Sequence, residues 1–436
     1  MIEHKTLIRF LLIGALLSLC PSGFTQTLSL EHAESLALEK DPGYQGLMKQ
    51  SRALEDDAIA ESQLPDPMLM VGWLNVPVAD FALDEEPMNQ LRVGLKQNFP
   101  VGDTLNLKRK SALADASRVR QQSVTRRLMV LQNTRNTWIE VWYGEASLKI
   151  VRENEPMFEQ LRDVTASLYR TGRKGLDDLV RSELELQRLK DREVRITENV
   201  GRQRAFLGRW IGSEESRLLL PEKLPVWETH FADRMADSSQ IVAHPLVRAM
   251  DERIAKLQQG VELAREQYKP AWSLELGYAF RNAQRPNGAE VSDLASLSAS
   301  VSLPVFTAKR QDKRLSSANR QANAGLDQRL DLLYELKSRL EAELVTLDRL
   351  NERIELYDSM ILPQTQEQAQ VALLSYKADR SDFTEVMRSH VAQLESTLEL
   401  ERLQADRLKS IAAIKYFLPR GEDLDRVSAE LPGESK

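Results

Sequence analysis

The chain has 436 residues, of which 42% are apolar and 28% charged, and its 19 glycines and 17 prolines are fewer than average usage, which favours long elements with few turns. After the N-terminus no run of 18 apolar residues occurs, and this excludes a bundle of membrane-spanning helices. The net charge of -6 gives no reason to expect nucleic acid as a partner, because proteins that bind it carry an excess of lysine and arginine.

The N-terminus has the pattern of an export signal. Two basic residues precede the apolar run 10–19, and small or polar residues follow it. We therefore predict a signal peptide over residues 1–25 and a mature chain that leaves the cytoplasm. Cys20 is the only cysteine, so no intramolecular disulfide can form. It is also a candidate for lipidation, although its two neighbours are unfavourable for that modification.

The second half of the mature chain restates the first about 205 residues later, which indicates an internal duplication. The longest match aligns 169–182 with 376–389 without a gap. The predicted organisation is a first repeat over 26–220, a linker over 221–240, a second repeat over 241–419 and a mobile tail over 420–436.

Each repeat combines helical and strand-like periodicity. An amphipathic helix is followed by two windows in which apolar residues alternate with polar or small ones, and then by a long helical hairpin. The predicted strands cover about 66–75 and 90–99, then about 271–281 and 293–303, and the hairpins cover about 102–212 and 305–418. We expect Pro156 and Pro363 to kink the long helices rather than end them.

The alternating windows are typical of strands with one face toward lipid and one toward a lumen. The candidate membrane-facing residues are Leu69, Val71, Trp73, Leu91, Val93, Leu95, Trp272, Leu274, Leu276, Tyr278, Leu297 and Val301. Four strands cannot close a useful barrel, and unpaired edges in hydrocarbon leave backbone groups unsatisfied. We therefore expect three copies to share a barrel of twelve strands. The predicted fold class is mainly α, with duplicated coiled-coil hairpins, four strands per chain, and a trimeric duct made of an α-barrel and a small membrane β-barrel.

The ends of the two hairpins carry one pattern: Tyr, Gly three residues later, an aliphatic or aromatic residue at seven, an acid at nine and an aliphatic residue at ten. The first copy fits with Tyr169, Gly172, Leu176, Asp178 and Leu179, and the second with Tyr376, Phe383, Glu385 and Val386, where Asp379 stands in place of the glycine. On this pattern, and over nearly the whole mature chain, the sequence resembles the TolC family of outer-membrane efflux proteins. The segments 63–68 and 84–90 resemble the heavy-metal branch (cobalt-zinc-cadmium/copper, with RND pumps) more than the drug branch.

The resemblance implies a homotrimer in the outer membrane of a Gram-negative cell, in contact with its lipid, with the helices projecting into the periplasm. Its implied partners are a periplasmic adaptor (a membrane fusion protein) and an inner-membrane RND pump, and its implied cargo is heavy-metal ions. The implied periplasmic gate comprises Tyr169, Asp178, Arg181, Tyr376, Arg380, Glu385 and Arg388, and the implied adaptor-docking residues are Gly172, Gly175, Leu176, Asp379 and Phe383. The alternative for the charged ones is an ordinary solvated face at a helix start.

Other functions stay open at this level. A multidrug or type I secretion duct has the same architecture, and a soluble periplasmic coiled-coil adaptor or scaffold would explain the helices and the signal but not four strand windows. An enzyme is not expected, since no GxSxG, P-loop or GxGxxG occurs. The five histidines are scattered, so neither a metal site nor a cofactor is predicted.

Overall fold

The computed structural model describes residues 27–79, 81–82, 86–227, 239–285, 287–419 and 423. The predicted signal peptide, Cys20 and nearly all of the predicted tail lie outside these residues. Two compact units divide the chain. Unit 1 comprises Met1–Asp41, Leu128–Asp233 and Leu340–Lys436, and unit 2 comprises Pro42–Arg127 and Arg234–Arg339. Each unit takes segments from both halves of the sequence, so the predicted repeats are units of sequence rather than of packing.

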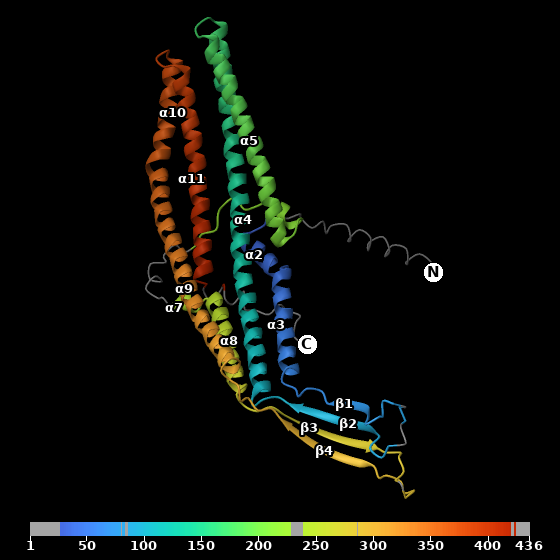
Figure 1. Ribbon diagram of the computed structural model, residues 1–436. Helices are drawn as coiled ribbons and strands as arrows, with labels where there is room; N and C mark the ends of the chain where they lie inside the picture. The colour runs from blue at the N-terminus through green and yellow to red at the C-terminus, as the bar shows by residue number, and fades with distance from the viewer. Residues whose placement is uncertain are drawn as a thin grey trace, which may run out of the picture. The chain divides into compact units, whose positions relative to one another are not determined.

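Unit 2 contains a four-stranded antiparallel sheet in the order β1-β2-β3-β4 (Figure 1). Its strands are β1 (Met68–Leu74), β2 (Gln90–Phe99), β3 (Trp272–Phe280) and β4 (Leu294–Val301), and each lies inside one of the four alternating windows. The central pair joins the halves of the chain, with Gly94 opposite Gly277. β1 and β4 are therefore the two edges of an open sheet.

Helices complete unit 2. These are α3 (Pro42–Ala60), α7 (Ser239–Val242), α8 (Pro245–Glu266) and the adjoining parts of α4 (Thr104–Arg170) and α9 (Gln311–Leu356). α8 begins where it does because His244 is its N-cap, with its Nδ1 accepting from the Leu246 N–H at 3.2 Å, and Pro245 occupies the first turn. Lys256 of α8 pairs with Asp115 of α4 at 2.8 Å.

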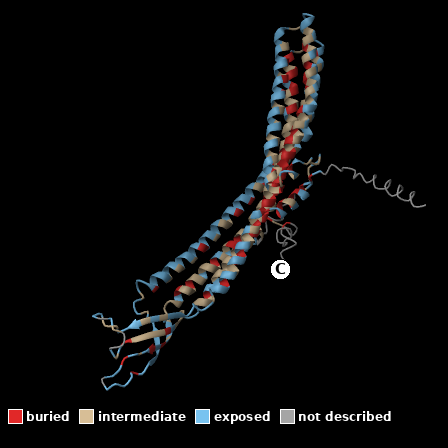
Figure 2. Ribbon diagram, turned by 90° about the vertical axis from the view of Figure 1, so that its right-hand side faces the viewer, coloured by how far each residue is buried: buried red, intermediate tan, exposed pale blue. Residues whose placement is uncertain are grey.

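Unit 1 is helical within the described residues. Its elements are the remaining parts of α4 and α9, together with α2 (Leu30–Glu39), α5 (Leu176–Ile211), η1 (Glu215–Arg217), η2 (Tyr357–Ile361), α10 (Leu362–Lys377) and α11 (Phe383–Phe417). α11 supplies much of the core, with buried residues at helical spacing such as Phe383, Met387 and Leu394. Figure 2 shows buried residues gathered along the sides where these long helices face one another.

The two prolines act differently. Pro156 lies inside α4, which runs without interruption for 67 residues. In the second half, a π-helical turn at Tyr357–Ile361 separates α9 from α10, and Pro363 follows it in the first turn of α10. A π turn places one extra residue in the helix, so the chain reaches the second proline with a local change of pitch that the first half lacks.

A buried ionic cluster ties the start of the described chain to α4. Arg135 lies 2.6 Å from Glu34 of α2 and 2.7 Å from Asp423, and all three side chains are buried. Trp138, one turn further on, donates to the Leu28 carbonyl at 3.0 Å. Within the described ranges no helix is both long and apolar enough to cross a bilayer.

Candidate functional site

The turn between α4 and α5 closes the first hairpin of unit 1. Gly172 has a positive φ of 69° and donates its N–H to the Tyr169 carbonyl at 2.9 Å, while the Arg173 N–H reaches the Leu168 carbonyl at 2.9 Å. This pair of bonds is the Schellman end of a helix, which needs one residue in the left-handed region. A glycine adopts that region without steric cost, which explains its place in the pattern.

The turn between α10 and α11 has the same backbone. Asp379 has φ 61° and donates its N–H to the Tyr376 carbonyl at 3.0 Å, and the Arg380 N–H reaches the Ser375 carbonyl at 2.8 Å. Aspartate is among the few residues that tolerate the left-handed region. The second turn is therefore as tight as the first, although it has no glycine.

Two side-chain contacts join the turns within unit 1. Lys174 Nζ lies 2.9 Å from an Asp379 carboxylate oxygen and 5.2 Å from the centre of the Tyr376 ring. Arg181, near the start of α5, donates to the Thr384 hydroxyl near the start of α11. Arg181 is one of the predicted gate residues, whereas Lys174 is not, because the aligned position in the second half is Ser381 and no pattern marks the lysine.

The acids at the turns have opposite electrostatic environments. Burial, followed by the negative charge of Asp177, raises the pKa of the Asp178 carboxyl. The ion pair with Lys174 lowers the pKa of Asp379. Burial, with Asp178 and Asp379 nearby, raises the pKa of the Tyr376 phenol to about 12. Its hydroxyl has no hydrogen-bond partner among the described residues.

The other predicted gate and docking residues divide by burial. Gly172, Gly175 and Leu176 are exposed, as a docking surface requires. Phe383, in contrast, is fully buried, with its ring centre 5.7 Å from that of Tyr376, so it is a core residue of this conformation. Glu385 pairs at 3.1 Å with Arg388 on its own helix, and Asp178 makes no ion pair within the described residues.

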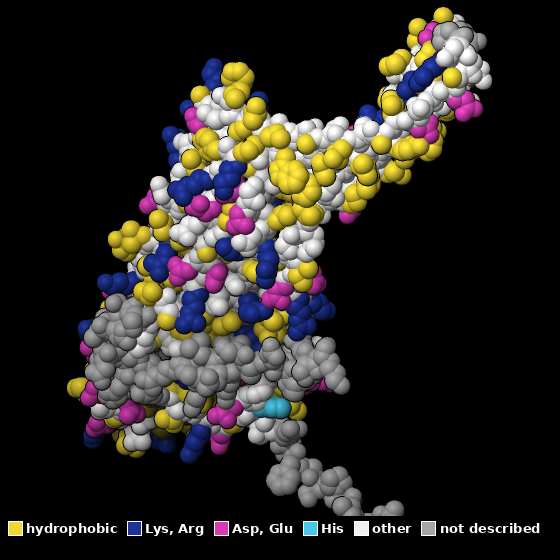
Figure 3. Space-filling view, turned by 90° about the horizontal axis from the view of Figure 1, so that it is seen from below, with side chains coloured by type: hydrophobic (Ala, Val, Ile, Leu, Met, Phe, Trp, Pro, Cys, Tyr) yellow, Lys and Arg dark blue, Asp and Glu magenta, His cyan; other side chains and the backbone are white. Residues whose placement is uncertain are grey.

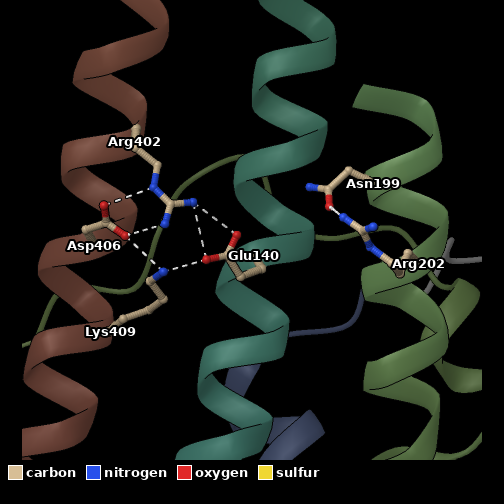
Figure 4. A network of polar contacts seen from close by, with 6 residues as sticks. All are labelled: Glu140, Asn199, Arg202, Arg402, Asp406 and Lys409. Carbon is tan, nitrogen blue, oxygen red and sulfur yellow. Dashed lines mark hydrogen bonds and ion pairs between the residues drawn. The ribbon is translucent and has the colours of Figure 1, made fainter. Parts of the chain in front are cut away.

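A charged network links α4 to α11 away from the turns (Figure 4). Glu140 of α4 lies 3.2 Å from Arg402 and 2.5 Å from Lys409, and Asp406 pairs with the same two cations at 2.8 and 2.9 Å. The four charges balance, which makes their partial burial tolerable. The network is not evident from the sequence. Asp406 is spaced i,i+4 from Arg402 and i,i+3 from Lys409, as in ordinary pairs on a solvated helix, and no residue pattern places Glu140 beside them.

The sheet of unit 2 has an apolar and a polar face, set by the register. Leu69, Leu95, Leu276 and Leu297 are exposed on the apolar face, the first and last at 70%. On the central strands β2 and β3 the polar face is more covered, with Gly94 and Gly277 buried and Ser273 only 9% exposed, whereas the residues of β4 are exposed on both faces. Figure 3 shows hydrophobic side chains gathered along this part of the chain. All twelve predicted membrane-facing residues lie on the apolar face, with Leu91 and Val93 half-buried and the other ten exposed.

No protein-family model matches the chain, and no curated protein matches it. Solved structures do. The outer-membrane channel OprN matches with a TM-score of 0.76 at 17% identity, covering 90% of this chain and 90% of its own. The outer membrane protein VceC from Vibrio cholerae matches with 0.75 at 15% identity, covering 90% and 96%. CusC, whose crystal structures concern folding and transmembrane channel formation, matches with 0.73 at 14% identity, covering 90% and 92%.

The chain has the fold of these outer-membrane proteins. The likeness confirms the predicted architecture at the level of a mainly helical chain with a small four-stranded antiparallel sheet, as in TolC-like channels. OprN is described as an outer-membrane channel and VceC as an outer membrane protein. At these identities the likeness is one of fold, so assembly, gating and cargo are questions for the residues themselves.

Proposed function

We propose that the chain is the outer-membrane channel of a tripartite efflux pump, conducting cargo passively from a periplasmic adaptor and an inner-membrane pump to the outside. The observation that carries this proposal is the exposed apolar face of the sheet. A soluble sheet buries its apolar face, and a contiguous exposed patch of this kind marks contact with another apolar phase. Lipid is the phase that fits, because strands that alternate apolar and polar residues suit a membrane barrel. The shared fold with outer-membrane channels supports the same function.

The open edges of the sheet support a homotrimer. Among the described residues, β1 and β4 each leave one row of backbone groups without a strand partner, which is costly in hydrocarbon. Two copies would give eight strands, whose interior has room for packed side chains or one small ligand but not for an aqueous channel. The polar face carries Arg92, Lys96 and Glu275, which need water around them. Three copies give twelve strands and an aqueous lumen, and we propose that their duplicated hairpins form the tube on the periplasmic side.

Fractionation and conductance test the channel. We expect the full-length protein in the outer-membrane fraction, as a trimer after chemical cross-linking, with ion conductance in planar lipid bilayers. Recovery as a soluble periplasmic protein would refute the channel and favour the other class of function, a coiled-coil adaptor or scaffold. Nothing in the sheet favours that second class, since an adaptor has no use for an exposed apolar face on four strands.

We further propose that the two turns of unit 1 form the periplasmic gate and meet the adaptor through exposed residues such as Leu176. The support is that Lys174 and Asp379 already bridge the turns, and that Asp178 has no ion pair among the described residues, which leaves it available to a neighbouring copy. Asp178→Arg should let small antibiotics leak inward, because it places a cation beside Lys174 and Arg181. Asp191→Arg reverses an exposed charge further along α5 and is the matched control, with no leak expected. Equal permeability of the two variants would count against the gate.

Heavy-metal ions are the proposed cargo, with a multidrug or type I secretion duct as the alternative. The support is the loop sequence at 63–68 and 84–90, and CusC is one of the structures that share the fold. A deletion strain, complemented or not, should be compared on copper, silver, zinc, cobalt and cadmium salts and on hydrophobic drugs. Sensitivity to metals alone would support the metal cargo. Sensitivity to drugs alone would refute it and leave the channel proposal intact.

A further inference from the structure

The strands of the sheet contain three charged residues, and all three lie on its polar face. Arg92 and Lys96 are four residues apart on β2, so they share one face, and Glu275 on β3 is the register partner of Lys96. β1 and β4 contain no charged residue. The charge of this face is therefore set by two cations and one anion.

The arginine is neutralised by the glutamate. Arg92 Nη2 lies 2.9 Å from a Glu275 carboxylate oxygen and 3.3 Å from the Ser296 hydroxyl. Gly277 leaves room for this contact, since a Cβ there would lie 2.9 Å from Ser296 Oγ and 3.0 Å from Arg92 Nε. The guanidinium thus lies across β3 toward β4, and its charge is compensated where it rests.

The lysine has no such partner. Lys96 makes no ion pair or hydrogen bond among the described residues, and its register neighbour on the other side is Met68 of β1. The remaining positions on this face are all uncharged. The small ones are Gly72, Gly94, Ser273, Gly277, Ala279, Ser296, Ser298 and Ser300, and the larger ones are Met68, Met70, Leu74, Gln90, Asn98 and Leu294. Each sheet therefore presents one uncompensated positive charge on this face.

We propose that Lys96 makes the barrel of the channel prefer anionic solutes. The inference rests on the proposed trimer, in which three copies place three such lysines around one lumen. Rings of lysine or arginine favour anions in pores, and low-dielectric walls strengthen the effect. The ring of lysines also discriminates between the forms of a metal cargo. Its positive charge repels a free divalent cation and attracts an anionic complex of the same metal.

The test is the ratio of chloride to potassium permeability, measured from reversal potentials of the full-length channel in a bilayer with a KCl gradient at low salt. The wild type should give a ratio above one. Lys96→Glu should lower it at least about threefold, since a full charge is reversed beside the ion path where screening is weak. Glu275→Gln should raise it, because it frees the charge of Arg92 while glutamine keeps the hydrogen bond.

Lys223→Glu makes the same change of charge on an exposed residue of unit 1, outside every helix and strand, and should leave the ratio unchanged. A channel whose ratio is the same in the wild type and in Lys96→Glu would overturn this inference and leave the proposed function standing. An equal shift in Lys96→Glu and Lys223→Glu would also overturn it, because the effect would not belong to the lumen. A protein that conducts nothing would overturn both proposals together.

Discussion

The two hairpin turns of unit 1 share a sequence pattern and a backbone, yet their side chains have opposite environments. Tyr169 is 42% exposed, whereas its counterpart Tyr376 is 2% exposed. Leu176 is 53% exposed, whereas its counterpart Phe383 is fully buried. The pattern of a turn therefore specifies local geometry, through a left-handed residue and two backbone bonds, while burial depends on what packs against the turn. The second turn is flanked by side chains in the core of unit 1, and the first by exposed side chains.

The largest effect should come from the buried member of the second pair. Phe383→Ala removes a fully buried ring and leaves a cavity, so the free energy of unfolding should fall by about 3–5 kcal/mol. Leu176→Ala, at the aligned exposed position, should change it by no more than about 0.5 kcal/mol. Thermal unfolding followed by circular dichroism measures both. Similar losses for the two variants would show that the turns do not differ in burial in the assembled protein.

The two residues in the left-handed region, Gly172 and Asp379, should differ in how well they tolerate substitution. Gly172→Ala should destabilise the first turn by about 1–2 kcal/mol, since an L-residue with a Cβ is strained there and no neighbouring atom is close enough to add a clash. Asp379→Asn should be nearly neutral for the backbone, because asparagine tolerates the same region. Limited proteolysis at each turn, beside the melting temperature, would locate the change. A neutral Gly172→Ala would contradict the assigned conformation.

Substitutions of Tyr376 and Tyr169 should change the free energy of unfolding less, and in the stabilising direction. Tyr376→Phe removes a buried hydroxyl that has no partner among the described residues, and should stabilise the protein by about 1 kcal/mol. Tyr169→Phe should have almost no effect, since that hydroxyl meets water. If Tyr376→Phe instead destabilises the trimer or causes leakage, its hydroxyl bonds to a neighbouring copy, and the tyrosine belongs to the gate after all.

The smallest effect concerns pH. Lys174 holds the pKa of Asp379 below its usual range, so the pair stabilises the turns above the unfolded pKa of about 3.9 and loses that contribution as pH falls through the lowered value. Lys174→Gln should lower the melting temperature slightly at pH 7, and the difference from wild type should vanish in strong acid. High salt should shrink it as well. A difference that persists in acid would assign the effect to packing against Tyr376 rather than to charge.

The sequence predicted most of the fold, because the relevant signals are periodic. Four windows with a period of two became four strands, and the helical stripes became long helices. The sequence did not predict which side chains at the turns are buried, since Phe383 and Leu176 occupy the same position of the same pattern. The π turn at Tyr357–Ile361 has no sequence signature, whereas Pro156, which does look like an interruption, lies in a continuous helix.

The candidate site was predicted in outline and missed in its contacts. Tyr376 and Asp178 follow from the pattern at the turns. Lys174 does not, because its ion-pair partner is Asp379, which replaces the expected glycine in the other half. The network around Glu140 depends on which faces of α4 and α11 meet. The role proposed for Lys96 depends on the side-chain contact between Arg92 and Glu275, because the register alone places Glu275 opposite Lys96. Pairing between distant segments is tertiary information that residue spacing does not contain.

The pairing of β2 with β3 has a consequence for how the protein is made. The Arg92–Glu275 contact joins residues 183 positions apart, so the central ladder of the sheet cannot form until the second half of the chain has been synthesised. Non-local pairing is slow to nucleate, and strands that wait for their partners expose apolar surface that promotes aggregation. In the outer-membrane channel proposed above, the first two strands must remain shielded from other chains while the rest of the polypeptide arrives. Folding of the sheet is thereby coupled to completion of the chain, and we expect a truncated first half to be degraded rather than inserted.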